Sequence, residues 1–291
     1  MKKKIFVYFS LIALVMFLLN DSLTVLANNT DNLYSDYQKY NLLSGETSYH
    51  LFCDLPETSD GGFSPGYFPN GIAFDTESDI SPLAVVGDDN RTLITNTAIG
   101  LYCNTVYIET TYASTPNTVY LGTGFILGPS AVEPYGSESV SVSADDVVVS
   151  TGFINSPGPD NDWAVIELST DIGNTTGWLG LRWQSNTYNG TSVTNTGYPA
   201  VVNGVNTNKQ MYKGDGTIME SYTNTLRGTW DASGGNSGGP VYAYYNSTGY
   251  TAIGILTSGS SDNTFNQEYP TAYSTATRIT QEMYNLFVTY R

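Results

Sequence analysis

Apolar and polar residues alternate along most of the chain from position 85 onward, in short runs separated by Gly, Asn, Pro and Asp. A two-residue period predicts β-strands, because successive strand side chains point to opposite faces. The runs lie at 105–110, 119–127, 140–150, 163–168, 191–196, 210–218, 241–245 and 251–256. Helical spacing is confined to the tail, in Ile279, Met283, Leu286 and Phe287. The pattern predicts an all-β protein with a C-terminal helix, built as a sandwich or as two packed barrels.

The first 27 residues carry three lysines, then an apolar run over 5–19, then small residues. This order is typical of a secretory signal peptide. We therefore expect residues 1–27 to be removed and the product to be secreted and extracellular. No second apolar stretch of about 18 residues follows in the sequence, so we expect no membrane span after signal removal. With a formal net charge of -16, the chain is not expected to bind nucleic acid or anionic membranes.

Residues 28–84 show little sustained periodicity and contain many glycines and prolines. This composition is typical of a linker or a prosegment, so we predict a prosegment at 28–84 and a folded domain at 85–291. Two cysteines, Cys53 and Cys103, could pair after export or remain free thiols. Neither belongs to a metal-ligand spacing such as C-x-x-C, and we predict no metal site and no cofactor.

A serine surrounded by glycines lies in Gly234-Gly235-Asn236-Ser237-Gly238-Gly239-Pro240. Its G-x-S-x-G pattern fits the nucleophile elbow of α/β-hydrolases, but a strand follows it instead of a helix, and no histidine follows it. The alternative is a chymotrypsin-like site, where glycines let the N–H groups of Gly235 and Ser237 form an oxyanion hole. That fold places its residues in the order histidine, aspartate, serine. Asp162, which directly precedes an apolar run, fits as the aspartate.

Several further motifs lie between position 85 and the C-terminus. They are Val85-Val86-Gly87-Asp88-Asp89-Asn90-Arg91, Gly122-Thr123-Gly124-Phe125-Ile126-Leu127-Gly128-Pro129, Asp162-Trp163-Ala164-Val165-Ile166, Thr196-Gly197-Tyr198-Pro199 and Thr277-Arg278-Ile279-Thr280. Together they resemble the secreted bacterial glutamyl endopeptidases, a branch of the chymotrypsin-like serine proteases. The resemblance implies two antiparallel β-barrels with the active site between them, Ser237 as nucleophile and Asp162 as the residue that orients the histidine. It also implies a zymogen cleaved near Ala84, acting as a monomer on protein or peptide substrates.

The resemblance breaks where the family carries its catalytic histidine. After Gly128-Pro129 the family continues into T-A-G-H or a close variant, whereas this chain passes through 130–132 directly to a segment that the family has well past the histidine. The piece is missing as if excised, so we expect the first barrel to be incomplete. The single histidine, His50, precedes Asp162 and Ser237 as required, but it lies in the predicted prosegment.

The predicted specificity pocket also departs from the family. Members that cleave after glutamate use a histidine in the strand that follows the serine and a threonine shortly before the serine. This chain has Leu256 and Ala232 at these places. A buried substrate carboxylate without a cationic or hydroxyl partner is unfavourable by several kcal/mol. We therefore do not expect the glutamate preference to extend to this chain.

Three functions remain open from the sequence. The first is a secreted serine endopeptidase homologue that is inactive or nearly so, because a serine hydroxyl without a base is a weak nucleophile. The second is an active serine endopeptidase that uses His50 or another base. The third is a β-rich extracellular module that binds peptide or carbohydrate, suggested by 23 tyrosines and a polar composition. The missing histidine favours the first.

Overall fold

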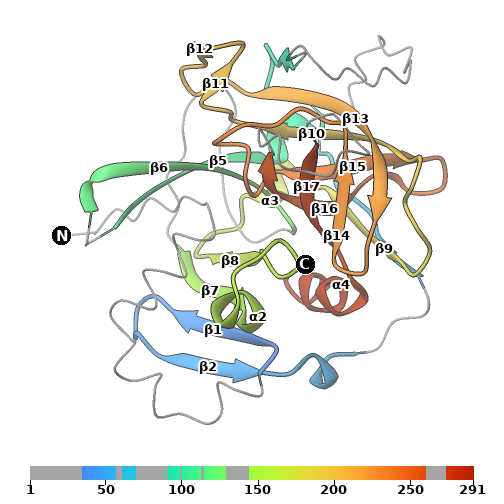
Figure 1. Cartoon of the computed structure of the whole chain (residues 1–291). Helices are drawn as coiled ribbons and strands as arrows, with labels where there is room; N and C mark the ends of the chain where they lie inside the picture. The colour runs from blue at the N-terminus through green and yellow to red at the C-terminus, as the bar shows by residue number, and fades with distance from the viewer. Residues whose placement is uncertain are drawn as a thin grey trace.

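The structure, a computed structural model, describes residues 35–56, 61–69, 89, 91–98, 100–112, 115–128, 144–259 and 273–291. Its largest unit is a closed barrel of six strands from the C-terminal half of the chain (Figure 1). Around the barrel the order is β15 (Pro240–Tyr245), β10 (Ser192–Gly197), β13 (Tyr212–Ser221), β14 (Thr225–Gly228), β17 (Ser274–Arg278) and β16 (Gly249–Gly259). Pairing of β16 with β15 closes the barrel, and every pairing around it is antiparallel.

Successive side chains of a barrel strand point alternately into the barrel and away from it, and this decides which of them fill the barrel. In β15, Val241 and Ala243 pack in the barrel core, while Tyr242 between them packs in a second cluster on the other face. In β16, Ile253 faces the barrel core and Ala252 faces the second cluster. Both faces of β15 and β16 carry buried apolar side chains, so alternate residues of these two strands serve two different clusters.

Three further strands extend the barrel sheet. Strand β9 (Gly180–Gln184) pairs in parallel with β16, and β3 (Gly61–Ser64) pairs antiparallel with β9. Strand β4 (Thr92–Leu93) pairs with β13. A separate small hairpin joins β11 (Val201–Val202) to β12 (Val205–Asn206).

The first half of the domain consists of two sheets. One is a hairpin of β5 (Thr105–Tyr112) and β6 (Thr115–Phe125), and the other has the order β2 (Thr47–His50), β1 (Tyr37–Asn41), β7 (Ala144–Ser150), β8 (Ala164–Leu168). Among the described residues these two sheets do not join into a second closed barrel. The predicted all-β fold is confirmed, and the described part of the first barrel is open.

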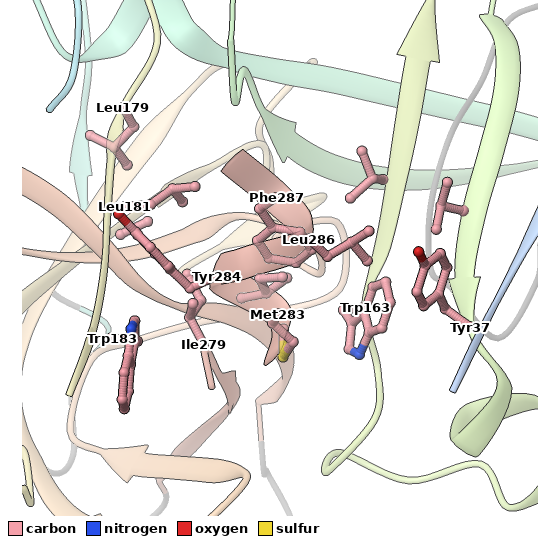
Figure 2. Close-up of a cluster of buried hydrophobic side chains, with 14 of the residues drawn as sticks. Tyr37, Trp163, Leu179, Leu181, Trp183, Ile279, Met283, Tyr284, Leu286 and Phe287 are labelled. Carbon is pink, nitrogen blue, oxygen red and sulfur yellow. The ribbon is translucent and has the colours of Figure 1, made fainter. Parts of the chain in front are cut away.

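The two halves meet around the C-terminal helix α4 (Gln281–Val288). The Oγ1 atom of Thr280 accepts a hydrogen bond from Met283 N and caps the helix. Figure 2 shows the side chains of α4 lying between the wall of the barrel and Trp163 of the first half. The Trp163 and Phe287 rings meet edge to face, with centroids 5.7 Å apart. The helix predicted from the spacing of the tail is therefore confirmed, and it packs against both halves.

Short helices complete the described chain: η2 (Phe52–Asp54), η3 (Tyr102–Asn104), α2 (Thr151–Asn155) and α3 (Gly173–Thr176). No helix among the described residues is long and apolar enough to cross a membrane.

Part of the segment predicted to be a prosegment contributes strands to the domain. Strand β1 pairs with β7 along its whole length, and Tyr37 in β1 is 7% exposed. Sequence periodicity did not indicate β1, β2 and β3, which lie in the Gly- and Pro-containing segment 28–84, and β1 and β3 pair with strands far along the chain. Whether 28–84 is removed stays a prediction. The signal peptide predicted at 1–27 lies outside the described residues.

The two cysteines are free thiols in this structure. Cys103 Sγ has two carbonyl oxygens within hydrogen-bonding distance of its single S–H, that of Thr176 at 2.7 Å and that of Gly100 at 3.1 Å, while Cys53 is exposed. Of the two states left open by the sequence, the structure has the unpaired one.

Candidate functional site

The serine-containing loop lies between β14 and β15 and needs its glycines. Gly235 and Gly238 have φ angles of +99° and +85°, which side chains other than glycine rarely adopt. A Cβ atom on Gly238 would also clash with the carbonyl oxygen of Thr123, and one on Gly235 with that of Tyr198. The glycine-rich sequence thus permits a loop that passes directly against neighbouring backbone.

Thr123 of β6 joins this loop to the first half of the domain. Its backbone N–H donates to Ser237 O at 2.8 Å, and its hydroxyl donates to Gly235 O at 2.7 Å. On the other side of the loop, Gly238 N donates to Leu256 O at 2.7 Å. Contacts from both halves of the domain therefore hold the serine.

The hydroxyl of Ser237 donates a hydrogen bond to Thr257 O at 3.2 Å. Neither the Ser237 N–H nor the Gly235 N–H donates a hydrogen bond to another described residue. Two N–H groups beside a serine, left without protein acceptors, are the donors from which an oxyanion hole is built.

Asp162 lies in the turn before β8, and its backbone carbonyl accepts a hydrogen bond from Thr277 Oγ1 at 3.0 Å. Its carboxylate has no such support: Oδ1 is buried and contacts no hydrogen-bond partner among the described residues. Burial raises the pKa of Asp162 to about 7, because desolvation disfavours the charged form. A buried carboxylate without a partner destabilises the fold, and such groups are often found at functional sites.

Asp162 and Ser237 line one cavity of about 180 Å³ between the two halves. Most of its wall is apolar and comes from β6, β8, β16 and α4, including Val165, Leu256 and Phe287. The structure therefore brings together the aspartate and the serine that the sequence singled out. Residues 129–143, where the histidine segment of the family would lie, fall outside the described residues.

His50 is not among the residues that line this cavity. It is the last residue of β2, where its ring stacks on Tyr37 with centroids 5.1 Å apart. Its Nε2 atom forms a hydrogen bond with Ser48 Oγ at 2.8 Å. The single histidine of the chain is thus held by other partners, in a strand whose neighbour β1 separates it from β7.

The two residues predicted for a specificity pocket lie beside the serine loop. Leu256 is 2% exposed and packs in the barrel core, and Ala232 packs against the same cluster. The Leu256 backbone makes two hydrogen bonds with the loop: its carbonyl accepts from Gly238 N–H, and its N–H donates to Gly239 O at 2.9 Å. Leu256 therefore supports the loop and forms part of the cavity wall.

Sequence reasoning missed a buried arginine that holds the serine loop. The Arg91 side chain is 5% exposed, and its Nη1 atom donates to Ser233 Oγ at 2.7 Å and to Asn236 Oδ1 at 3.2 Å. Its Nη2 atom pairs with Asp89 at 2.5 Å, and this contact lowers the pKa of the Asp89 carboxyl to about 2. Its place in the motif 85–91 was visible in the sequence, but its partners in the serine loop, Ser233 and Asn236, are over a hundred positions away.

Within the described residues, no group of three or more His, Cys, Asp or Glu side chains could hold a metal ion. We therefore find no metal site in that part of the molecule.

Comparisons with known proteins show the family and the fold of the chain. The family model described as Trypsin matches residues 93–283. A protein named extracellular metalloprotease from Bacillus subtilis is 30% identical over 231 residues, covering 71% of this chain and 69% of the relative. A glutamyl endopeptidase from Bacillus licheniformis is 30% identical over 224 residues, covering 69% of this chain and 67% of the relative. A solved structure of a Glu endopeptidase in complex with MPD has a TM-score of 0.51 at 24% identity, covering 71% of this chain and 98% of that one.

Proposed function

The chain belongs to the trypsin family of chymotrypsin-like serine proteases, in the branch of the glutamyl endopeptidases, and we propose that it is a secreted member with little or no peptidase activity. In this proposal Ser237 occupies the place of the nucleophile and Asp162 that of the orienting acid. Gly235 and Ser237 supply the oxyanion donors. The cleft retains the ability to bind a peptide, and the general base is missing.

One observation carries the proposal: the chain has a single histidine, and that histidine is outside the cavity that Asp162 and Ser237 share. A serine protease needs an imidazole between the two, to accept the serine proton and to be held by the carboxylate. Here the Ser237 hydroxyl donates to Thr257 O, and Asp162 Oδ1 has no described partner. Loss of the triad histidine costs about 10⁶-fold in turnover, or about 8 kcal/mol of transition-state stabilisation.

The contacts around the serine favour retained binding over a collapsed cleft. The glycine conformations, the Thr123 hydrogen bonds and the Arg91 contacts all hold the loop in one arrangement. Because Gly235 N–H and Ser237 N–H have no acceptor among described residues, a peptide carbonyl can bind there. Weak turnover from the oxyanion donors alone is compatible with this arrangement.

The side chains at 232 and 256 do not support a preference for glutamate. Ala232 and Leu256 offer neither a hydroxyl nor a cation to a substrate carboxylate. We propose that the pocket beside Ser237 binds an apolar or small side chain instead. Fluorescence anisotropy with a series of fluorescently labelled peptides that vary this position tests the preference by binding, without any turnover being required.

Export is part of the proposal. The leading 27 residues have the order of a signal peptide, and one relative is named as extracellular. N-terminal sequencing of protein collected from the culture medium tests both processing steps. A first residue near 28 supports signal removal with retention of 28–84, and a first residue near 85 supports removal of the prosegment.

Activity is tested with the purified protein, its Ser237→Ala variant and its His50→Ala variant. Each is incubated with a mixed peptide library and with a diphenyl phosphonate that labels activated serines. We expect all three to cleave peptides at indistinguishable rates and none to be labelled. Turnover that Ser237→Ala abolishes would contradict the proposal, and the His50→Ala variant would then show whether that histidine is the base.

A further inference from the structure

We propose that the cavity between Asp162 and Ser237 is a binding site for an imidazole group supplied from outside the chain, as a histidine side chain of a bound peptide. This inference rests on the proposed function, since it requires that the chain lacks a base of its own. It assigns a ligand chemistry to a cavity that would otherwise enclose an unpaired carboxylate.

The polar groups of the cavity match one imidazole ring. Asp162 Oδ1 is a buried acceptor without a described partner, and the Ser237 hydroxyl, which donates to Thr257 O at 3.2 Å, lines the same cavity and can rotate to another acceptor. A neutral imidazole carries one N–H donor and one nitrogen acceptor, which complement the carboxylate acceptor and the hydroxyl donor. An ammonium group has three donors and a guanidinium has five, and most of them would face apolar wall.

Two other polar side chains on the wall, Glu167 and Thr123, already have partners. The Glu167 carboxylate pairs with Lys39 Nζ at 2.8 Å. The Thr123 hydroxyl donates to Gly235 O and accepts from Tyr198 N–H at 2.9 Å. Among the charged side chains of the described wall, Asp162 is therefore the one left to attract a donor.

The size and character of the cavity also suit a flat ring. A cavity of roughly 150 Å³ with apolar walls is large enough to bind benzene, and this one measures about 180 Å³. Imidazole is smaller than benzene and presents two apolar faces. Phe287 and Leu256 of the wall can contact those faces while the ring nitrogens reach the polar groups.

Burial of Asp162 raises its pKa to about 7. An N–H donor at Oδ1 stabilises the charged form and lowers that pKa, so binding of the ring and ionisation of the carboxyl favour each other. A bound ring would thus relieve a destabilising feature of the empty site. Its second nitrogen would then be available to accept the Ser237 proton.

The chemistry can be followed with a diphenyl phosphonate. Ser237 Oγ forms a bond to phosphorus, a phenoxide leaves, and the serine proton passes to the imidazole, which later releases it to the leaving phenoxide. No other reactant is consumed. Imidazole should therefore increase the rate at which Ser237 is labelled.

The test titrates imidazole into the secreted protein and measures binding by isothermal titration calorimetry, with the change in tryptophan fluorescence, to which Trp163 on the cavity wall contributes, as a second readout. N-Methylimidazole is the matched ligand, since it keeps the acceptor nitrogen but lacks the N–H. Asp162→Asn removes the charge, and Ala164→Leu fills part of the cavity. We expect imidazole to bind the wild-type protein and to bind either variant about tenfold more weakly. N-Methylimidazole should bind the wild-type protein about tenfold more weakly than imidazole does. A histidine-containing peptide and its glutamine counterpart distinguish a side-chain ligand from the free ring.

The outcomes separate this inference from the proposed function. Labelling of Ser237 without any imidazole would overturn the proposed function. Absence of imidazole binding in an unlabelled protein would overturn this inference and leave the proposed function intact. Equal binding of imidazole and N-methylimidazole to all variants would also overturn it, because the affinity would then not come from Asp162. Circular dichroism of each variant checks that the fold is kept.

Discussion

Replacing Asp162 with asparagine is expected to stabilise this protein at neutral pH, which is unusual for an aspartate at a protease site. The carboxylate is buried, its Oδ1 atom has no described hydrogen-bond partner, and burial raises its pKa from the ordinary 3.8 to about 7. Asparagine has nearly the same shape but carries no charge. The substitution therefore removes the cost of burying an unpaired anion.

The magnitude follows from the change in pKa. The folded state holds the Asp162 proton up to about pH 7, whereas the unfolded state releases it near pH 3.8. Between these values the folded state binds more protons, so the free energy of unfolding falls as the pH rises. Each pKa unit corresponds to about 1.4 kcal/mol, which gives a cost of about 4 kcal/mol that is complete above pH 7 and absent below about pH 4.

Urea denaturation of the wild type and Asp162→Asn at pH 4, 6 and 8 measures this cost. The two proteins should have similar stability at pH 4, and the variant should be more stable by up to about 4 kcal/mol at pH 8. Asp160→Asn is the matched control, because Asp160 is exposed in the same turn and its charge is in water. A variant that is less stable at pH 8, or a difference that does not change with pH, would refute the reasoning.

The remaining predictions concern the loop, its arginine and the N-terminal strand. Gly238→Ala should destabilise the fold by about 1–3 kcal/mol, because its φ of +85° and its contact with Thr123 O exclude a Cβ. Urea denaturation measures this loss. Gly190→Ala is the control that separates the clash from the φ angle, since Gly190 also has a positive φ but has open space around it. Arg91→Met should lower the free energy of unfolding at pH 7. Because Arg91 holds the Asp89 pKa low, the variant should also lose less stability than the wild type as the pH falls from about 4 to 2. The same acid unfolding curve for both proteins would contradict this. Tyr37→Ala should cost about 3–5 kcal/mol in protein that retains 28–84, and no loss there would show that β1 is dispensable.

The fold class could be predicted from sequence because it depends on local patterns. Alternation of apolar and polar residues marked most barrel strands, and the spacing of Met283 and Phe287 marked the last helix. Strands β1 and β3 were not indicated, because their order comes from pairing with β7 and β9, far away in the chain.

For the site, the sequence identified Ser237 and Asp162 from their neighbours in the chain, and the structure places both on one cavity wall. The roles assigned to these two residues, to Gly235 and to positions 232 and 256 stay predictions. Arg91 was missed because a charged residue near a turn has no local signal, and its burial depends on Ser233 and Asn236.

The sequence by itself determined that this chain carries one histidine and that the residues following Gly128 differ from those of its family. It also determined the glycines that let the Ser237 loop form. The tertiary structure alone decided that His50 of β2 packs against Tyr37 of β1, and that Asp162 Oδ1 is buried without a described partner beside an apolar cavity. The physical reason is that desolvation and hydrogen-bond partners depend on which distant segments meet, whereas a motif records the residues next to one another in the chain.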